Sequence, residues 1–475
     1  MKGLFLALNL KNLPINMAGS DETQIMQFEN EHFSKADFGN DFCWGTVTAA
    51  FQVEGAVRED GKGASVWDVF THKRGKIKNG DHADVACDFY HSYEADLALV
   101  VEMGFTEFRF SIAWSRILPD GKGEVNQAGI DFYNRLIDKC IALGIKPWVT
   151  LYHWDLPQAL ERLGGWKNRE IIHWFSDYVV ICAQSFGDRV KNWIVINEPM
   201  AVAALGYTTG LHAPGKRGLW NFLPVTHHLA MCQAAGGRIL RERVSDAYIG
   251  MAISCSHIVP YTNAVRDVRA AQRADAVMNR MFIEPALGLG YPSDVFPFLN
   301  GIKKYMLPGD AEALQFDFDF TGIQNYFSIT VKHSYLIPVL WLKEVPATLR
   351  NVPVTAMGWE IDTEGTYKIL KQFSAYKRIR DIIVSESGAA FEDRLVEGKI
   401  IDADRIAYFQ QYLGQVLKAK NEGINIRGYL VWSLMDNFEW AEGYRARFGL
   451  VHVDFDSQRR TMKESGKWFA RFLKN

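Results

Sequence analysis

One phrase recurs along this chain: a long amphipathic run ends at a glycine, and a short run rich in β-branched and aromatic residues follows. Glycine often ends a helix because it adopts the left-handed backbone conformation without steric penalty. The clearest copies pair helices over 84–103, 126–143, 169–186 and 402–422 with strands over 105–111, 145–151, 190–197 and 424–432. Alternation of this kind predicts parallel βα units.

Further strand-like runs at 42–46, 249–254, 320–326 and 382–385 bring the predicted strands to eight. Eight parallel strands with intervening helices predict an α/β chain folded as a single (β/α)8 TIM barrel with extended βα loops. An open doubly wound sheet gives the same alternation but usually carries a glycine-rich phosphate turn after its first strand. Here that position reads Gly45-Thr-Val-Thr-Ala-Ala. The Asp-Gly-Lys-Gly turns at 60–63 and 120–123 lack the Ser or Thr that completes a phosphate loop.

The amino terminus is expected to lie outside the barrel. Its apolar run is broken by Asn9 and closed by Lys11, which makes a poor signal sequence. Residues 1–33 are therefore interpreted as an N-terminal extension, and residues 34–475 as the barrel catalytic domain. No linker rich in Pro, Gly or Ser divides that domain, and its length is within reach of one TIM barrel.

Composition limits the partners of this chain. The formal net charge is −2 and no basic block is present, which argues against nucleic acid. No run approaches the ~18 apolar residues needed to cross a bilayer, so no membrane partner is expected. The six cysteines are scattered, without C-x-x-C spacing or a nearby H-E-x-x-H motif. This favours reduced thiols in a cytoplasmic protein and predicts neither a metal site nor a cofactor. The oligomeric state is left open.

Polar and aromatic residues close most of the predicted strands, and in a TIM barrel these ends form the active-site face. Those at or near the strand ends are Gln52, Arg109, His153, Trp154, Asn197, Glu198, Asn325, Tyr326, Glu386, Trp432, Glu439 and Trp440. Amides and imidazoles bond to hydroxyls, and indole rings offer flat apolar faces, so a sugar pocket is predicted. For His153, Trp432 and Trp440 the alternative is ordinary core packing.

Two of these side chains are carboxylates on separate strands, Glu198 and Glu386. Glu386 follows the buried run at 382–385, which is itself preceded by a basic run at 376–380 interpreted as helical. An unpaired charge at the end of a buried strand is costly, so a packing role explains Glu386 poorly. Glycoside hydrolysis requires such a pair, ~5 Å apart for retention and ~6.5–9.5 Å apart for inversion.

Motifs at these strand ends give the chain a resemblance to a known family. They are Ile196-Asn-Glu-Pro199, Val384-Ser-Glu-Ser-Gly388, Thr150-Leu-Tyr-His-Trp-Asp155, Phe108-Arg-Phe-Ser-Ile-Ala-Trp-Ser-Arg116 and Trp432-Ser-Leu-Met-Asp-Asn-Phe-Glu-Trp440. From about Phe38 onward the chain resembles glycoside hydrolase family 1, the β-glucosidase family of retaining (β/α)8 enzymes. The resemblance implies hydrolysis of terminal non-reducing β-D-glycosyl residues, from small β-glycosides or cello-oligosaccharides, through a covalent glycosyl-enzyme intermediate.

The resemblance also implies roles for individual residues. Glu198 would be the general acid/base and Glu386 the nucleophile, supported by Arg109, Tyr326 and Asn325. The residues that would bind substrate are Gln52, His153, Trp154, Asn197, Trp359, Trp432, Glu439 and Trp440. Among these, Trp432 would be the stacking floor and Trp359 would border the leaving-group site.

The chain departs from the family pattern at two positions. Val195 stands where Thr is usual, and it is interpreted as a packing substitution. Ser387 stands where Asn usually follows the nucleophile, and this shorter side chain is expected to alter how Glu386 is oriented. Residues 335–354 lack a familiar pattern and are interpreted as a variable loop at the aglycone entrance.

Three alternative functions share parts of this pattern. A 6-phospho-β-glycosidase is disfavoured because a negative Glu439 would oppose a sugar phosphate. A catalytically silent sugar-binding barrel is disfavoured because both carboxylates are present. Transglycosylation, in which a sugar acceptor outcompetes water, is not decided by the sequence.

Overall fold

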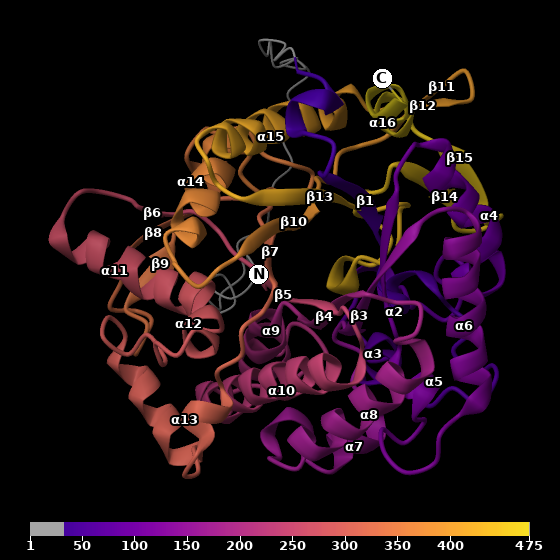
Figure 1. Cartoon of the computed structure of the whole chain (residues 1–475). Coiled ribbons are helices and arrows are strands. Elements are labelled where there is room, and N and C mark those ends of the chain that lie inside the picture. The colour runs from indigo at the N-terminus through magenta and orange to yellow at the C-terminus, as the bar shows by residue number, and fades with distance from the viewer. Residues whose placement is uncertain (1–32, 475) are drawn as a thin grey trace.

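The computed structural model describes residues 33–474, so all but the last residue of the predicted N-terminal extension lies outside the described residues. Parallel strands close a barrel in the order β1-β13-β10-β7-β5-β4-β3-β2, and helices surround it (Figure 1). The barrel strands are β1 (Cys43–Val47), β2 (Glu107–Ser111), β3 (Lys146–Tyr152), β4 (Asn192–Asn197), β5 (Tyr248–Ser254), β7 (Phe320–Gln324), β10 (Asp381–Ser387) and β13 (Ile426–Trp432). The predicted TIM barrel and all eight of its strands are confirmed.

The helices and the remaining strands complete the architecture. The longer helices are α4 (Phe89–Glu102), α6 (Gln127–Ala142), α8 (Ile171–Phe186), α10 (Phe222–Arg243), α11 (Val265–Asp275), α14 (Thr363–Ser374), α15 (Ala403–Asn421) and α16 (Glu464–Lys474). The shorter ones are α2 (Ala50–Val53), α3 (Val66–Thr71), α5 (Trp114–Ile117), α7 (Gln158–Arg162), α9 (Pro199–Ala201), α12 (Ile283–Ala286) and α13 (Asp310–Ala313). The small sheets pair β6 (Ile258–Pro260), β8 (Ile329–His333) and β9 (Leu342–Glu344), then β11 (Arg394–Val396) with β12 (Lys399–Ile401), and β14 (Val451–Asp454) with β15 (Arg459–Met462).

The glycines between helix and strand act largely as predicted. Gly104, Gly144 and Gly423 have φ values of 82°, 73° and 92° after α4, α6 and α15, a conformation that other residues adopt only at a cost. Gly187 after α8 differs, because its φ is −69°. There a Cβ atom would lie 2.5 Å from the Ala183 carbonyl oxygen, so close packing rather than backbone handedness requires glycine.

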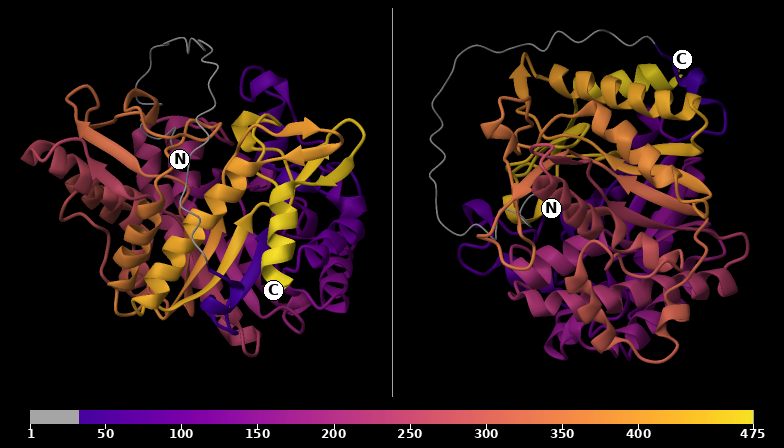
Figure 2. Two further views of the ribbon diagram at one scale, coloured as in Figure 1. Left: turned by 90° about the horizontal axis from the view of Figure 1, so that it is seen from above. Right: turned by 90° about the vertical axis from the view of Figure 1, so that its left-hand side faces the viewer.

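Two segments differ from their predicted structure. The basic run at 376–380 was predicted to be helical, but α14 ends before it, at Ser374. Tyr376 and Arg378 instead hydrogen-bond to Glu284 and to the Leu287 carbonyl, and these tertiary contacts hold the run in a turn. The predicted variable loop at 335–354 contains β9, which pairs with β8. Figures 1 and 2 show that this small sheet and α11 project from one side of the barrel.

The barrel interior is a packed core below the active-site face. Trp148, Ile194, Phe320, Ile383 and Leu430 fill it from five different strands, and each is at most 1% exposed. A second, larger core lies between the strands and the surrounding helices. Because the interior is filled, a ligand of the barrel itself would bind above it, at the carboxyl ends of the strands.

Candidate active site

A cavity of about 350 Å³ opens at the carboxyl ends of the barrel strands. This volume lies within the range of small-molecule sites. Its lining includes most of the predicted site residues, namely Gln52, His153, Trp154, Asn197, Glu198, Tyr326, Trp359, Glu386, Trp432, Glu439 and Trp440. The remaining lining residues are Leu205, Leu211, His212, Ser254, Phe327, Met357, Ala441, Glu442 and Phe448, which sequence reasoning did not single out.

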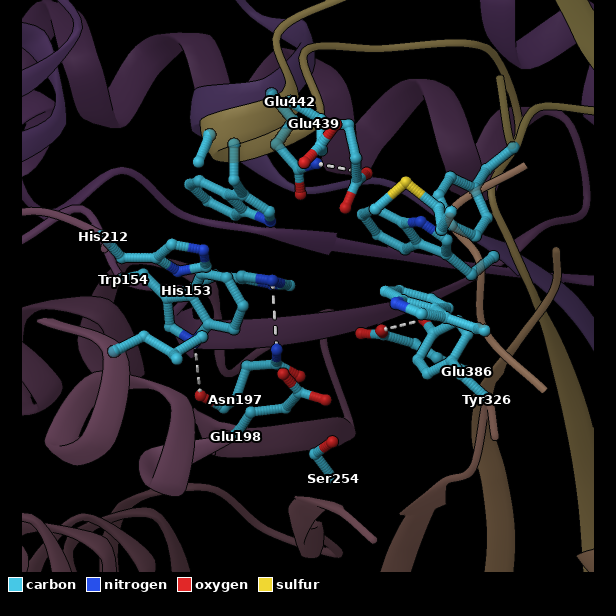
Figure 3. A pocket seen from close by; sticks show the side chains of 18 of the residues that line it. His153, Trp154, Asn197, Glu198, His212, Ser254, Tyr326, Glu386, Glu439 and Glu442 are labelled. Atoms are coloured by element: carbon cyan, nitrogen blue, oxygen red, sulfur yellow. Dashed lines mark hydrogen bonds between the residues drawn. The ribbon is translucent and has the colours of Figure 1, made fainter. Parts of the chain in front are cut away.

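Both glutamates follow an irregularity in the strand ladder. The register of β4 against β5 shifts between Ile194 and Asn197, just before Glu198. The register of β10 shifts after Val384 against both β7 and β13, around Glu386. Such bulges re-aim side chains next to active sites. Figure 3 shows both glutamates extending into the same cavity.

The backbone at Glu198 is also unusual. Its φ of 42° and ψ of 63° place it in the left-handed region immediately before Pro199, the first residue of α9. A non-glycine residue in this region costs ~1–3 kcal/mol and persists only when its surroundings enforce it. The strand ends in one direction and the helix leaves in another, so Glu198 lies at the sharp turn between them.

Glu386 has two strong hydrogen-bond donors. Arg109 Nη1 donates to Oε1 at 2.7 Å, and the Tyr326 hydroxyl donates to Oε2 at 2.7 Å. Arg109 is itself held by Thr150, which accepts from Nε at 2.9 Å, and by Asn197, whose Oδ1 accepts from Nη2 at 2.6 Å. Arg109 therefore fixes the predicted nucleophile and a predicted sugar ligand at the same time.

The two carboxyl groups are arranged to differ in protonation. Burial raises the pKa of Glu386, but Arg109 and Tyr326 act against that rise. Burial, and then the nearby charge of Glu386, raise the pKa of Glu198 to about 7. A proton shared between them therefore resides on Glu198, which lacks the ion pair that Glu386 has. Ser254, at the end of β5, lies beside Glu198 and opposes this rise in pKa.

The tautomer of His153 follows from its neighbours. Asn197 Oδ1 accepts from Arg109 and from Gln324 Nε2, so the Asn197 amide must present Nδ2 to His153 Nε2, 3.0 Å away. Nε2 is then the acceptor, and Nδ1 carries the proton. Burial keeps the pKa of His153 well below its usual value, so the ring is neutral. Nδ1 has no hydrogen-bond partner within residues 33–474 and remains a donor for a ligand.

Gln52 and Glu439 form another part of the cavity wall. Gln52 Nε2 donates to Asn437 Oδ1 at 2.9 Å and to the Phe438 carbonyl at 3.0 Å. These bonds orient the amide, and its Oε1 has no partner among the described residues. Burial, followed by the charges of Glu386 and Glu442, raises the pKa of Glu439 to about 8. The wall thus offers an acceptor and an acid to hydroxyl groups.

Indole rings complete the lining. Trp154 donates Nε1–H to the Asn197 carbonyl at 3.0 Å and packs against Trp440, with ring centroids 4.5 Å apart. Trp432 lies at the end of β13 above the filled interior. Trp359 packs against Phe327 at 4.9 Å, on the same side as Tyr326. Flat apolar faces and directed polar atoms therefore surround one space.

Residues 34–475 match the model of a protein family described as Glycosyl hydrolase family 1. The chain belongs to glycosyl hydrolase family 1. Beta-glucosidase A of Thermotoga maritima is 42% identical over 440 residues, which cover 92% of this chain and 98% of that protein. The 1,4-beta-D-glucan glucohydrolase of Thermotoga neapolitana is 41% identical, with the same coverage. The solved family 1 b-glucosidase from Thermotoga maritima superposes with a TM-score of 0.88, covering 92% of this chain and 98% of that one.

The structure shows the contacts of three positions in this family 1 enzyme for which the sequence raised an expectation, namely Asn325, Ser387 and Val195. Asn325 donates to the Cys255 carbonyl at 3.1 Å and accepts from Thr366 at 2.7 Å, so its hydrogen bonds hold the turn before Tyr326 rather than Glu386 itself. The Ser387 hydroxyl lies 3.5 Å from the Tyr408 hydroxyl, behind the strand. Val195 is fully buried and packs toward Gly236, as expected of a packing substitution.

Several functional contacts were missed from sequence. Ser254 lines the cavity beside Glu198, and Gln324 Nε2 donates to Asn197 at 2.8 Å. Both end barrel strands, so the rule that selected the other site residues would have found them. His212 and Leu205 come from the segment after β4, which carried no recognisable pattern.

The six cysteines are free thiols, and none of the helices within residues 33–474 is long and apolar enough to span a membrane.

Proposed function

We propose that this glycoside hydrolase is a retaining β-glucosidase that removes terminal non-reducing β-D-glucosyl residues, with Glu386 as nucleophile and Glu198 as acid/base. The observation that carries the assignment is the unequal environment of the two carboxyls. Glu386 is ion-paired and doubly hydrogen-bonded, as a nucleophile that must stay ionised requires. Glu198 has a pKa near 7 and holds the proton.

The first step uses both groups together. The Glu386 carboxylate attacks C1 of the sugar while Glu198 gives its proton to the glycosidic oxygen, so the C1–O bond breaks and the aglycone leaves as an alcohol. A glycosyl ester on Glu386 results. Arg109 and Tyr326 hold the carboxylate in place for the attack. Asn197, fixed by Arg109 and Gln324, is positioned to bond to the 2-hydroxyl.

The second step follows from the change of charge. Once Glu386 is an ester, its negative charge no longer raises the pKa of Glu198, which therefore falls. Glu198, now ionised, takes a proton from water, and the resulting hydroxide equivalent attacks C1. Glu386 departs as a carboxylate, and two inversions give net retention.

The polar atoms without partners support a sugar in the cavity. His153 Nδ1–H and Gln52 Oε1 supply one donor and one acceptor, and Glu439 adds a further group. Trp432 and Trp440 offer faces for stacking. The names of the relatives, beta-glucosidase and 1,4-beta-D-glucan glucohydrolase, support small β-glucosides and cello-oligosaccharides as substrates. Six free thiols support a cytoplasmic location.

The argument from a negative Glu439 against a 6-phospho-β-glycosidase does not hold at pH 7, because the pKa of about 8 leaves that group protonated, but the rest of the lining disfavours this alternative. The lining contains Glu198, Glu386, Glu439 and Glu442, and among the described residues it includes neither Lys nor Arg. A sugar phosphate would meet acids and no cation to offset its charge. Transfer to sugar acceptors stays a prediction, to be measured with nitrophenyl glycosides in the presence and absence of added glucose.

The stereochemistry of the products tests the assignment. Proton NMR during hydrolysis of an aryl β-glucoside should show β-glucose as the first anomer; an initial α anomer would overturn the retaining mechanism. With azide and an activated substrate, Glu386→Gly should yield the α-glucosyl azide, and Glu198→Ala the β-glucosyl azide. If the two azide anomers were exchanged, the roles of the two glutamates would be exchanged as well.

A further inference from the structure

Two histidines and an aspartate meet on the surface near the loop that contains Glu439 and Trp440. His72 follows α3, and His82 and Asp84 lie in the segment that leads to α4. His72 Nε2 lies 3.3 Å from Asp84 Oδ2, and His82 Nδ1 lies 3.4 Å from Asp84 Oδ1. The two imidazole rings stack at 5.1 Å, and a ligand atom from each of the three residues lies within 4.8 Å of the others.

In the neutral tautomer of His72 that its neighbours favour, Nε2 carries no proton. Nδ1 lies 2.8 Å from the Asp68 carbonyl, which can only accept, so Nδ1 carries the proton. In the neutral ring, Nε2 then directs a lone pair toward the Asp84 carboxylate, which is also an acceptor. Either a proton or a metal ion between Nε2 and the carboxylate would satisfy both acceptors. A histidine whose other nitrogen donates to a carbonyl is the usual arrangement of a metal-bound imidazole.

We propose that His72, His82 and Asp84 bind a transition-metal ion, with Zn²⁺ as the best-matched class. Zinc accepts two imidazoles and a carboxylate with bonds of ~2.0–2.2 Å and tetrahedral geometry, whose ligand-to-ligand edge is ~3.3–3.5 Å. The observed N–O separations of 3.3 and 3.4 Å have the length of that edge but join the imidazoles to different oxygens of Asp84, so the carboxylate would bind with both oxygens or turn one of them toward the ion. All three side chains are 30–51% exposed, so an ion reaches them from solvent, and water completes its coordination. No metal site was expected from the sequence.

A second group of similar composition shows what the first lacks. Asp393, Asp436 and His452 also bring ligand atoms together. There Lys463 Nζ lies 2.7 Å from a carboxylate oxygen of each aspartate and is fully buried. A fixed ammonium already supplies the positive charge at that place. At Asp84, by contrast, the two imidazoles can supply positive charge only by binding a proton. A metal ion displaces such a proton when it binds.

The segment that carries the site also holds the loop that contains Glu439 and Trp440. The Tyr444 hydroxyl donates to the His82 carbonyl at 2.9 Å, and Asp81 accepts from the Tyr444 amide at 3.0 Å. Lys78 pairs with Glu442 at 2.6 Å. On the other side, Trp67 of α3 packs against Trp440, with ring centroids 4.6 Å apart. A metal ion that joins His72 to His82 would connect α3 to the segment around His82. Both of these contact the loop containing Glu439 and Trp440, so the ion would restrict the motion of that loop.

Calorimetric titration of Zn²⁺ into the chelator-treated full-length protein tests the site. We expect one ion per chain in the wild type, and at least tenfold weaker binding in His82→Ala and in the isosteric Asp84→Asn. His173→Ala, which removes an exposed histidine from α8, is the control and should bind as the wild type does. Circular dichroism verifies that each variant is folded. Absence of binding to the wild type, or equal binding by all variants, overturns the proposal.

The proposed link to the loop has its own measurement. Zn²⁺ should slow amide hydrogen exchange at least threefold in a peptide spanning 441–445 in the wild type, and should leave that peptide unchanged in Asp84→Asn. Protection of 72–84 alone would show an ion that is bound without fastening the loop, and would overturn this part. Neither measurement depends on glycosidase activity, so the metal site and the proposed function succeed or fail separately.

Discussion

Arg109 Nη1 and Glu386 Oε1 form a buried ion pair 2.7 Å long, in which the two side chains are 1% and 5% exposed. The same guanidinium group reaches Asn197 on β4. One cation from β2 thus links the strand of the proposed nucleophile to the strand that precedes the proposed acid. Removing it would affect both the charge of Glu386 and the position of the sugar ligand beside Glu198.

Arg109→Met tests the electrostatic part of this link. Because Arg109 lowers the pKa of Glu386, its loss should raise that pKa, and the carboxylate form would be reached only at higher pH. The acid limb of kcat/KM should move up by about one to three pH units, and kcat/KM at pH 7 should fall ~10²-fold or more. Arg378→Met removes a surface ion pair as the control. An unshifted acid limb with lower activity would indicate a loss of structure alone.

The alkaline limb should belong to Glu198. Since this group must be protonated to act as an acid and its pKa is about 7, kcat/KM should decline as pH rises through about 7. Glu198→Gln should lose this limb, and kcat/KM for a poorly activated glucoside should fall ~10²- to 10⁴-fold. A dinitrophenyl glucoside, whose aglycone leaves without a proton, should be cleaved to its glycosyl-enzyme far better. An alkaline limb that persists in the variant would assign it to another group.

Glu439→Gln examines the sugar-binding wall. The substitution keeps the shape but replaces an acid, protonated at pH 7 because its pKa is about 8, by an amide, so kcat/KM for an aryl β-glucoside should fall about 2- to 13-fold, the equivalent of ~0.5–1.5 kcal/mol for a neutral hydrogen bond. A 6-phosphorylated glucoside should remain a poor substrate, because the lining still provides no cation. Efficient cleavage of the phosphorylated compound by the variant would contradict that reasoning.

Ser387→Ala addresses the departure next to Glu386. Because the hydroxyl faces Tyr408 rather than the carboxylate, kcat/KM should stay within about threefold of the wild type. Tyr326→Phe is the matched comparison, since it removes one hydroxyl that does bond to Glu386. That variant should lose ~10-fold or more and shift the acid limb upward. A large loss in Ser387→Ala would show that the hydroxyl acts on Glu386 after all.

Lys463→Met concerns stability away from the cavity. Lys463 is fully buried between Asp393 and Asp436, so its loss leaves buried carboxylates with less compensation and should cost ~3–5 kcal/mol in the free energy of unfolding. Lys467→Met breaks an ion pair that is 40% exposed at the lysine and should cost at most ~1 kcal/mol. Urea denaturation measures both. Equal losses would mean that burial of the pair contributes little.

The repeated helix–strand units and the polar residues at the strand ends could be predicted from the sequence. Helices stopped by glycine marked the barrel, and polar strand ends located Glu198, Glu386 and most of their neighbours. The run at 376–380 misled because its tyrosine and arginine bond to distant parts of the chain. Adjacency to Tyr326 does not fix the direction of the Asn325 side chain, which bonds to Cys255 and Thr366. The orientation of Asn197 and the tautomer of His153 depend on side chains from β2, β4, β7 and the end of β3, which no local pattern records.

The register shifts before Glu198 and Glu386 bear on attempts to transplant this chemistry. Placing two glutamates at the tips of a regular barrel would not reproduce their relative position, because each depends on an extra residue that displaces the main chain. A designer would have to copy the irregular ladder on both strands, and the Gly388 that follows, whose Cβ atom would otherwise lie 1.9 Å from the Trp432 carbonyl oxygen. A transplant would therefore have to move the irregular backbone segments of both strands together with Glu198 and Glu386.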